Sequence, residues 1–159
     1  MKIVHKQVNF LHAVLVSCLV LLSMSFSGTS FALEFRSVAV SKAILYDAPS
    51  DQAKKLFILS SGYPVEVIVN LGEWIKVRDH YGALSWIQGN LLSPKRTVLV
   101  IGGKAEVRQS DSENSPLLAT LEKDVVVDVV SVNAPNGWIK VKHRDGISGY
   151  VRVSQVWGF

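Results

Sequence analysis

The sequence predicts an all-β chain that contains two copies of one small β-barrel. An internal repeat is the first sign, because the motif Trp-Ile-Lys-Val at 74–77 returns 64 residues later at 138–141, and Gly82 returns as Gly146. Short β-branched runs separated by turn signals every 8–12 residues or so are the second sign. The third is that the chain after the apolar N-terminal segment has no sustained helical period.

The first copy alternates brief apolar runs with polar turns. A proline-containing loop at 47–51 divides its early runs, and Val65, Val67 and Val69 recur at the period of a strand. Turns follow at 71–73 and 79–82. We expect strands at 38–40, 43–45, 56–59, 65–69, 74–78 and 84–87.

The second copy repeats this order. Its polar loop at 109–116 matches the first proline loop, and its turn at 133–137 is longer than the corresponding turn of the first copy. We expect strands at 105–107, 117–121, 125–132, 138–143 and 148–153.

Each copy must close its sheet to be stable. A unit of about 60 residues without disulfides is near the lower limit for a domain, and closure into a barrel protects the sheet edges. We therefore predict one barrel at 35–93 and another at 97–159. The joint at 93–96 is short and leads into an apolar run at 97–101, which we expect to pack between the barrels instead of forming a flexible tether.

The first 32 residues resemble an export signal. Basic residues near the start precede an apolar run at 13–26, which is too short for a confident membrane span and typical of a signal-peptide core. Ser30 and Ala32 provide the small side chains of a cleavage site after Ala32. This predicts a periplasmic or secreted protein with no membrane attachment after cleavage.

Two alternatives for this segment stay open. An uncleaved anchor would have to include Asn9 and His12 in the span. Lipidation at Cys18 is suggested by the sequence Leu-Val-Ser-Cys at 15–18, but the chain stays strongly apolar beyond the cysteine.

Composition excludes several classes of function. Without residues 1–32 the chain keeps 15 basic and 13 acidic residues and no basic block, which argues against nucleic-acid binding. Cys18 is the only cysteine, so the exported chain has no disulfide and no catalytic thiol. His80 and His143 lack a second ligand at metal-binding spacing, so we expect neither a metal nor another cofactor.

The two copies resemble the bacterial SH3-like (SH3b) domain family. The resemblance rests on the repeated Trp-Ile-Lys-Val motif, the aromatic–aliphatic pairs at 86–87 and 150–151, and the segments 63–67 and 156–158, and it covers 35–159. The chain is similar to exported tandem SH3 proteins of Gram-negative bacteria. The resemblance implies two SH3-like barrels that bind a ligand, in a family whose modules often accompany cell-wall hydrolases.

The chain departs from the family pattern in its first loop and before its second aromatic. The first copy has the loop proline, Pro49, but not the arginine, while the second copy has Arg108 but not the proline. Ser85 replaces the glycine of the family's Gly-Trp-Val, which the second copy keeps as Gly149. A groove built on these residues would therefore differ between the copies.

Aromatic side chains are the candidate ligand contacts. The repeated tryptophans alternate with Ile and Val along their strands, so they either seal the barrels or form the wall of a groove. Two of the tyrosines are expected in loops, where an aromatic ring with a polar edge suits sugars or peptides. The candidates are Tyr46, Tyr81, Trp86, Tyr150, Trp74 and Trp138.

We expect a binding protein and no enzyme. Asp79 and His80 precede Ser85, but no nucleophile-elbow pattern surrounds that serine. The predicted ligand is peptidoglycan or a cell-wall peptide. The alternative is a periplasmic protein partner or a homodimer, which would use an exposed apolar end containing Trp157 and Phe159.

Overall fold

The computed structural model describes residues 33–134 and 136–159 and confirms the predicted all-β fold. These ranges contain fourteen strands and two single-turn 3-10 helices. Residues 33–159 form one compact unit. The predicted signal peptide, with its cleavage site and Cys18, lies outside the described residues.

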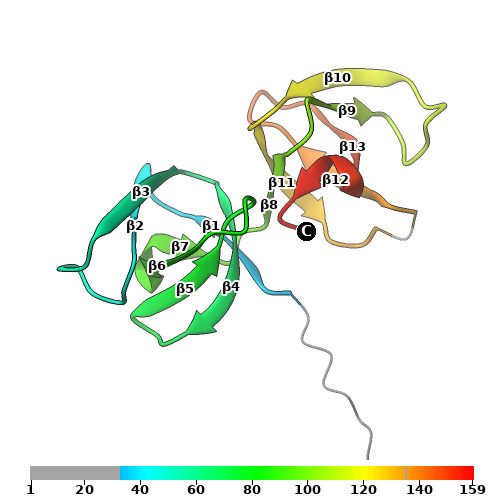
Figure 1. Cartoon of the computed structure of the whole chain (residues 1–159). Helices are drawn as coiled ribbons and strands as arrows, with labels where there is room; N and C mark the ends of the chain where they lie inside the picture. Colours follow the sequence, from blue (N-terminus) through cyan, green and yellow to red (C-terminus); the bar gives the residue numbers. More distant parts are fainter. Residues whose placement is uncertain (1–32, 135) are drawn as a thin grey trace, which may run out of the picture. The chain divides into compact units, whose positions relative to one another are not determined.

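The first copy folds into a seven-stranded antiparallel sheet with the order β3-β2-β6-β5-β4-β1-β7 (Figure 1). A single 3-10 turn, Gly89–Leu91, precedes its last strand. The strands are β1 (Phe35–Val38), β2 (Lys42–Tyr46), β3 (Lys55–Ser60), β4 (Pro64–Asn70), β5 (Trp74–Arg78), β6 (Leu84–Gln88) and β7 (Leu92–Ser93).

The second copy has the same topology, β10-β9-β13-β12-β11-β8-β14. Each of its strands therefore takes the place of one strand of the first copy, as the sequence repeat predicts. Its 3-10 turn is Val153–Gln155. The strands are β8 (Thr97–Val100), β9 (Lys104–Arg108), β10 (Leu117–Glu122), β11 (Val126–Ser131), β12 (Trp138–Lys142), β13 (Ser148–Arg152) and β14 (Val156–Trp157).

Each barrel has its own hydrophobic core. Alternation along β5 and β12 directs the aliphatic residues of the repeated motif inward, so Ile75 and Val77 lie in the first core and Ile139 and Val141 in the second. Burial of these side chains is the main stabilising term for barrels of this size. The tryptophans of the motif belong to neither core cluster.

The apolar run after the joint is a core strand of the second barrel. The prediction that it packs between the barrels is therefore only partly met. Val98 and Val100 on one face of β8 enter the second core. Thr97, on the other face, donates its hydroxyl hydrogen to the carbonyl of Gly62 in the first copy, at 2.6 Å.

Further contacts join the C-terminal end to the first copy. Gly158 adopts φ +111°, and a Cβ atom there would lie 2.8 Å from the Cβ of Pro64. Trp157 packs edge-on against Phe35, with ring centroids 5.1 Å apart. Arg96, in the joint, donates to the carbonyl of Gly158 at 3.0 Å. Partly buried polar and aromatic contacts therefore join the two copies.

Candidate ligand-binding cleft

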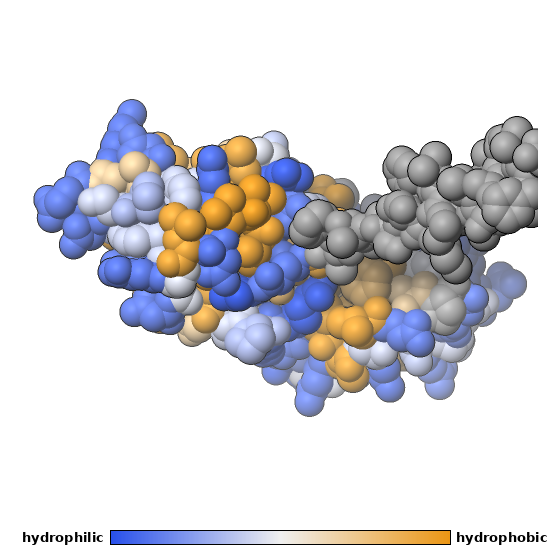
Figure 2. Space-filling model, turned by 90° about the horizontal axis from the view of Figure 1, so that it is seen from below, coloured by the Kyte–Doolittle hydropathy of each residue, from blue (hydrophilic) through white to orange (hydrophobic). Residues whose placement is uncertain are grey.

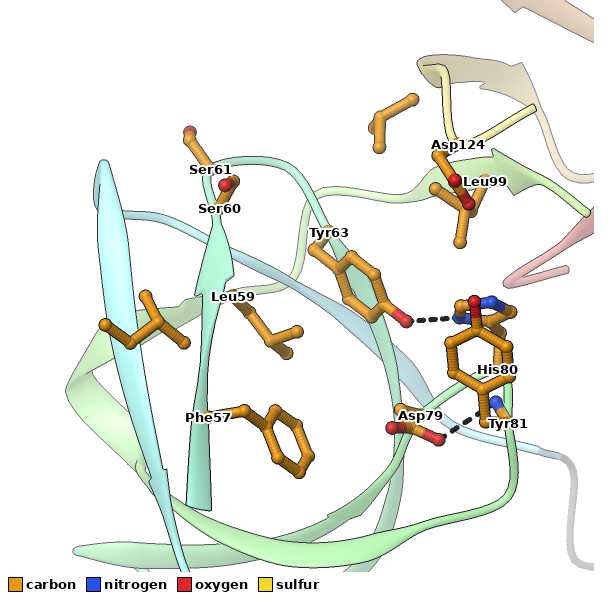
Figure 3. A pocket seen from close by; sticks show the side chains of 12 residues that line it. Phe57, Leu59, Ser60, Ser61, Tyr63, Asp79, His80, Tyr81, Leu99 and Asp124 are labelled. Atoms are coloured by element: carbon orange, nitrogen blue, oxygen red, sulfur yellow. Dashed lines mark hydrogen bonds between the residues drawn. The ribbon is translucent and has the colours of Figure 1, made fainter. Parts of the chain in front are cut away.

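A cleft of about 520 Å³ lies where the two copies meet (Figure 3). Strand β3, the residues before β4 and the β5–β6 turn form the wall from the first copy, while β8 and the start of β11 form the wall from the second. Its lining residues are Phe57, Ile58, Leu59, Ser60, Ser61, Tyr63, Asp79, His80, Tyr81, Leu99, Asp124 and Val126.

The β5–β6 turn is built by Asp79. Its Oδ1 accepts the backbone N–H groups of Tyr81 and Ala83, both at 2.9 Å. This pattern is an Asx turn, in which an aspartate side chain replaces a backbone acceptor. Gly82 completes the turn at φ +86°. The turn leaves the ring of Tyr81 74% exposed at the mouth of the cleft.

Tyr63, His80 and Tyr81 form a connected group (Figure 3). The Oη of Tyr63 and the Nδ1 of His80 are hydrogen-bonded at 2.5 Å, and the rings of His80 and Tyr81 lie 3.7 Å apart between centroids. Burial raises the pKa of Tyr63 to about 12, and the charge of Asp79 adds to this rise. The tyrosine hydroxyl therefore keeps its proton at neutral pH.

The cleft is acidic. Asp79 and Asp124 line it, and no Lys or Arg is among its lining residues in the described ranges. Asp124 lies in the β10–β11 turn at φ +67°, while its counterpart in the first copy is Gly62 at φ +79°. Aspartate tolerates this left-handed conformation better than most residues. The repeat thus places a carboxylate where the first copy has no side chain.

Tyr46, predicted to lie in a loop, is the last residue of β2 and is only 9% exposed. Its ring meets Trp74 edge-on at 5.4 Å between centroids, and Trp74 is equally buried. Neither side chain lines the cleft. The two rings therefore pack on each other outside the core cluster of the first barrel.

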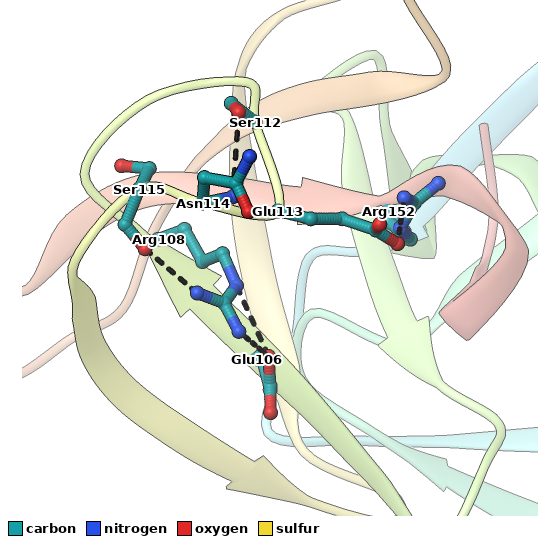
Figure 4. A network of polar contacts seen from close by, with 7 residues as sticks. All are labelled: Glu106, Arg108, Ser112, Glu113, Asn114, Ser115 and Arg152. Carbon is teal, nitrogen blue, oxygen red and sulfur yellow. Dashed lines mark hydrogen bonds and ion pairs between the residues drawn. The ribbon is translucent and has the colours of Figure 1, made fainter.

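Trp138 belongs to a smaller hollow on the second copy. The Arg152 guanidinium lies 4.7 Å from the centre of its ring, and Glu113 is paired with Arg152 (Figure 4). Arg108 is paired with Glu106 in the same network. Each arginine there has a carboxylate partner, so the hollow carries no unpaired arginine charge.

The remaining candidates lie outside the cleft. Trp86 and Tyr150 are partly buried on opposite copies, beneath the ammonium groups of Lys76 and Lys140. Trp157 lies against Phe35, and Phe159 packs against the second core. The C-terminal end therefore does not form the exposed apolar patch that we expected from the sequence.

Only Tyr81 among the predicted contact residues lines the cleft. Sequence reasoning did not select Tyr63, Asp124 or β3. A comparison of the repeats could have drawn attention to Asp124, because it aligns with a turn glycine. No local pattern indicates that β3 of one copy faces β8 and β11 of the other.

In the ranges 33–134 and 136–159, no three His, Cys, Asp or Glu side chains gather as metal ligands would. In the same ranges, none of the helices is long and apolar enough to cross a membrane.

The fold is a tandem pair of small β-barrels. The model of the bacterial SH3 domain family matches residues 39–94 and again 102–158. The chain belongs to this family, and the predicted tandem arrangement is confirmed. Bacterial SH3 domains indicate a cell-wall-binding or protein-binding module.

Similar solved structures are larger proteins. NlpC1 from Trichomonas vaginalis is 15% identical, with a TM-score of 0.37, over 82% of this chain and 47% of that one. NlpC2 from the same organism is 13% identical, with a TM-score of 0.38, and the match covers 81% of this chain and 49% of that one. An NlpC/P60 family protein from Bacillus cereus ATCC 10987 is 16% identical, with a TM-score of 0.35, and the match covers 77% of this chain and 55% of that one. The chain thus spans about half the length of these proteins, and no curated protein matches it.

Proposed function

We propose that this chain is a non-enzymatic module of the bacterial envelope that binds cell-wall peptides in the cleft between its two barrels. The observation that carries the proposal is the exposed ring of Tyr81, in contact with His80 at the mouth of a cleft that is lined by apolar and acidic residues. An exposed aromatic fixed by a turn provides contact area with little loss of side-chain freedom on binding.

The size and lining of the cleft support a peptide ligand. Its volume of about 520 Å³ lies within the range of small-molecule sites. Phe57, Leu59 and Leu99 provide apolar walls, while Ser60 and Asp124 provide polar groups at the rim. This combination suits a short chain with both amide groups and aliphatic side chains, which is the chemistry of a cell-wall peptide.

The cellular location is part of the proposal. The sequence of residues 1–32 has the features of a cleaved signal peptide, which would deliver the chain to the compartment that contains the cell wall. Membership in the bacterial SH3 domain family supports the same assignment.

Retention of the protein on purified peptidoglycan tests this function. Residues 33–159 form one compact unit and contain both cores, so we expect this segment to fold by itself. We expect the segment to sediment with sacculi and Tyr81→Ala to lose most of that retention. Tyr150→Ala is the matched control, because Tyr150 lies outside the cleft. A wild-type segment that stays in the supernatant would refute wall binding.

A further inference from the structure

Strand β3 is an open sheet edge. It is the terminal strand in its sheet and pairs only with β2 among the described strands. Its exposed side chains include the apolar Leu56 and Ile58, at 40% and 58% exposure. An unprotected edge strand is a ready template for pairing with another extended chain.

The cleft runs along this edge. Five consecutive residues, 57–61, line it. Successive side chains of a strand point to opposite faces, so a cavity on one face would contact only alternate residues. Contact with all five therefore places the cleft beside the backbone of β3 itself.

The hydrogen-bond register directs backbone groups of Ile58 into that space. The N–H of Ser61 donates to the carbonyl of Ser41 at 3.2 Å. In the same register Leu59 pairs with Ala43 and Ile58 with Ile44. Hydrogen-bonded and non-hydrogen-bonded pairs alternate in an antiparallel ladder. Leu59 therefore bonds to β2, and the N–H and C=O of Ile58 point away from it.

The facing wall carries unbalanced negative charge. Asp124 is exposed and forms no salt bridge within the described ranges, while Asp79 is buried in the lining of the first-copy wall. One oxygen of Asp79 already accepts two backbone N–H groups. Asp124 is therefore the carboxylate that is available to a ligand cation, and charge complementarity favours a ligand with a protonated amine.

We propose that the cleft takes an extended peptide that adds to β3 as a further antiparallel or parallel strand and places a protonated side-chain amine against Asp124. This inference rests on the proposed function and specifies its ligand. Pairing with the backbone of Ile58 supplies affinity, and Asp124 with the Tyr81 ring selects the side chain.

Synthetic pentapeptides test the two parts separately. The probe is acetyl-Thr-Val-Lys-Val-Thr-amide, with two relatives: one has Glu in place of Lys, and the other is N-methylated at both valines. By calorimetric titration of residues 33–159 we expect the lysine peptide to bind and both relatives to bind at least tenfold more weakly. Asp124→Asn should weaken the lysine peptide severalfold, while Asp145→Asn, in an exposed turn of the second copy, should not.

Hydrogen exchange provides a structural readout. Saturation with the lysine peptide should slow exchange of the Ile58 amide. The amide of Thr120, which occupies the corresponding edge position of β10, should not change. The inference is overturned if none of the peptides binds, if the N-methylated or the Glu peptide binds as well as the lysine peptide, or if Ile58 exchange is unaltered.

This result is separable from that of the sacculus experiment. If the segment sediments with peptidoglycan and binds no peptide, the strand-addition inference fails while the proposed function stands. If the segment binds the lysine peptide but does not sediment with peptidoglycan, the proposal that the ligand comes from the cell wall is wrong, while the strand-addition geometry holds.

Discussion

The ring of Tyr81 lies on the ring of His80 with centroids 3.7 Å apart, although Tyr81 is among the most exposed large side chains of the described chain. The aspartate-built turn below them fixes both residues, and Tyr63 holds His80 from the other side. An aromatic ring that is both fixed and exposed is the feature on which our account of binding depends.

Tyr81 and Tyr46, the two tyrosines that the sequence placed in loops, differ in exposure, so their replacement by alanine should affect stability differently. Tyr81→Ala removes a surface ring, so we expect the free energy of unfolding to change by less than about 0.5 kcal/mol while binding is lost. Tyr46→Ala removes a buried ring from Trp74 and should cost about 3 kcal/mol. Urea denaturation of both variants measures this contrast. A Tyr81→Ala protein as unstable as Tyr46→Ala would mean that Tyr81 is structural.

The half-buried hydroxyl of Tyr63 predicts a loss of stability at alkaline pH. Its pKa is raised from 10.0 in the unfolded chain to about 12 in the folded one, so its stabilising effect is complete below pH 10 and is lost as pH rises towards 12. Tyr63→Phe cannot ionise. Thermal melts from pH 8 to 11.5 should therefore show a steeper decline for the wild type than for this variant. Parallel pH profiles would contradict the assigned burial of the hydroxyl.

The contact between the C-terminal end and the first copy predicts a specific sensitivity at Gly158. An alanine there would combine an unfavourable φ of +111° with a Cβ only 2.8 Å from Pro64, and should cost about 2 kcal/mol or more. Gly72→Ala is the matched control, because that glycine has positive φ and open space around it. We expect it to cost about 1 kcal/mol. Equal losses in the two variants would show that the contact with Pro64 contributes nothing.

Ser85 is a position where we expect a substitution to leave stability unchanged or to raise it. Its hydroxyl is buried without a hydrogen-bond partner within the described residues. Removing an unsatisfied buried hydroxyl is usually neutral or favourable, so Ser85→Ala should leave stability unchanged or raise it by up to about 1 kcal/mol. Chemical denaturation checks this. A clear loss of stability would reveal a partner for the hydroxyl.

The strands were predictable because the hydrophobic alternation within each copy agrees with the sequence repeat between the copies. The alternation along 74–77 indicated that Trp74 faces the opposite side of the strand from Ile75 and Val77, and the structure places the aliphatic pair in the core. Tyr46 was misplaced because its position depends on packing. The proline loop begins at the next residue, but Tyr46 pairs with Lys55 and Trp86 in the sheet and packs against Trp74, 28 positions away.

The cleft itself was not predictable from sequence patterns. It requires β3 of one copy to face Asp124 and Val126 of the other, and that placement depends on contacts such as Thr97 with Gly62. Such contacts join residues far apart in the chain through backbone carbonyl groups, which every residue type provides. Residue identity therefore gives no signal for them.

The most direct test of the account is the sedimentation of residues 33–159 with purified peptidoglycan, for the wild type, Tyr81→Ala and Tyr150→Ala. The account predicts retention of the wild type and Tyr150→Ala and loss of Tyr81→Ala, with all three proteins folded. Retention of Tyr81→Ala at the wild-type level would place the binding site outside the cleft, and no retention of the wild type would contradict wall binding altogether.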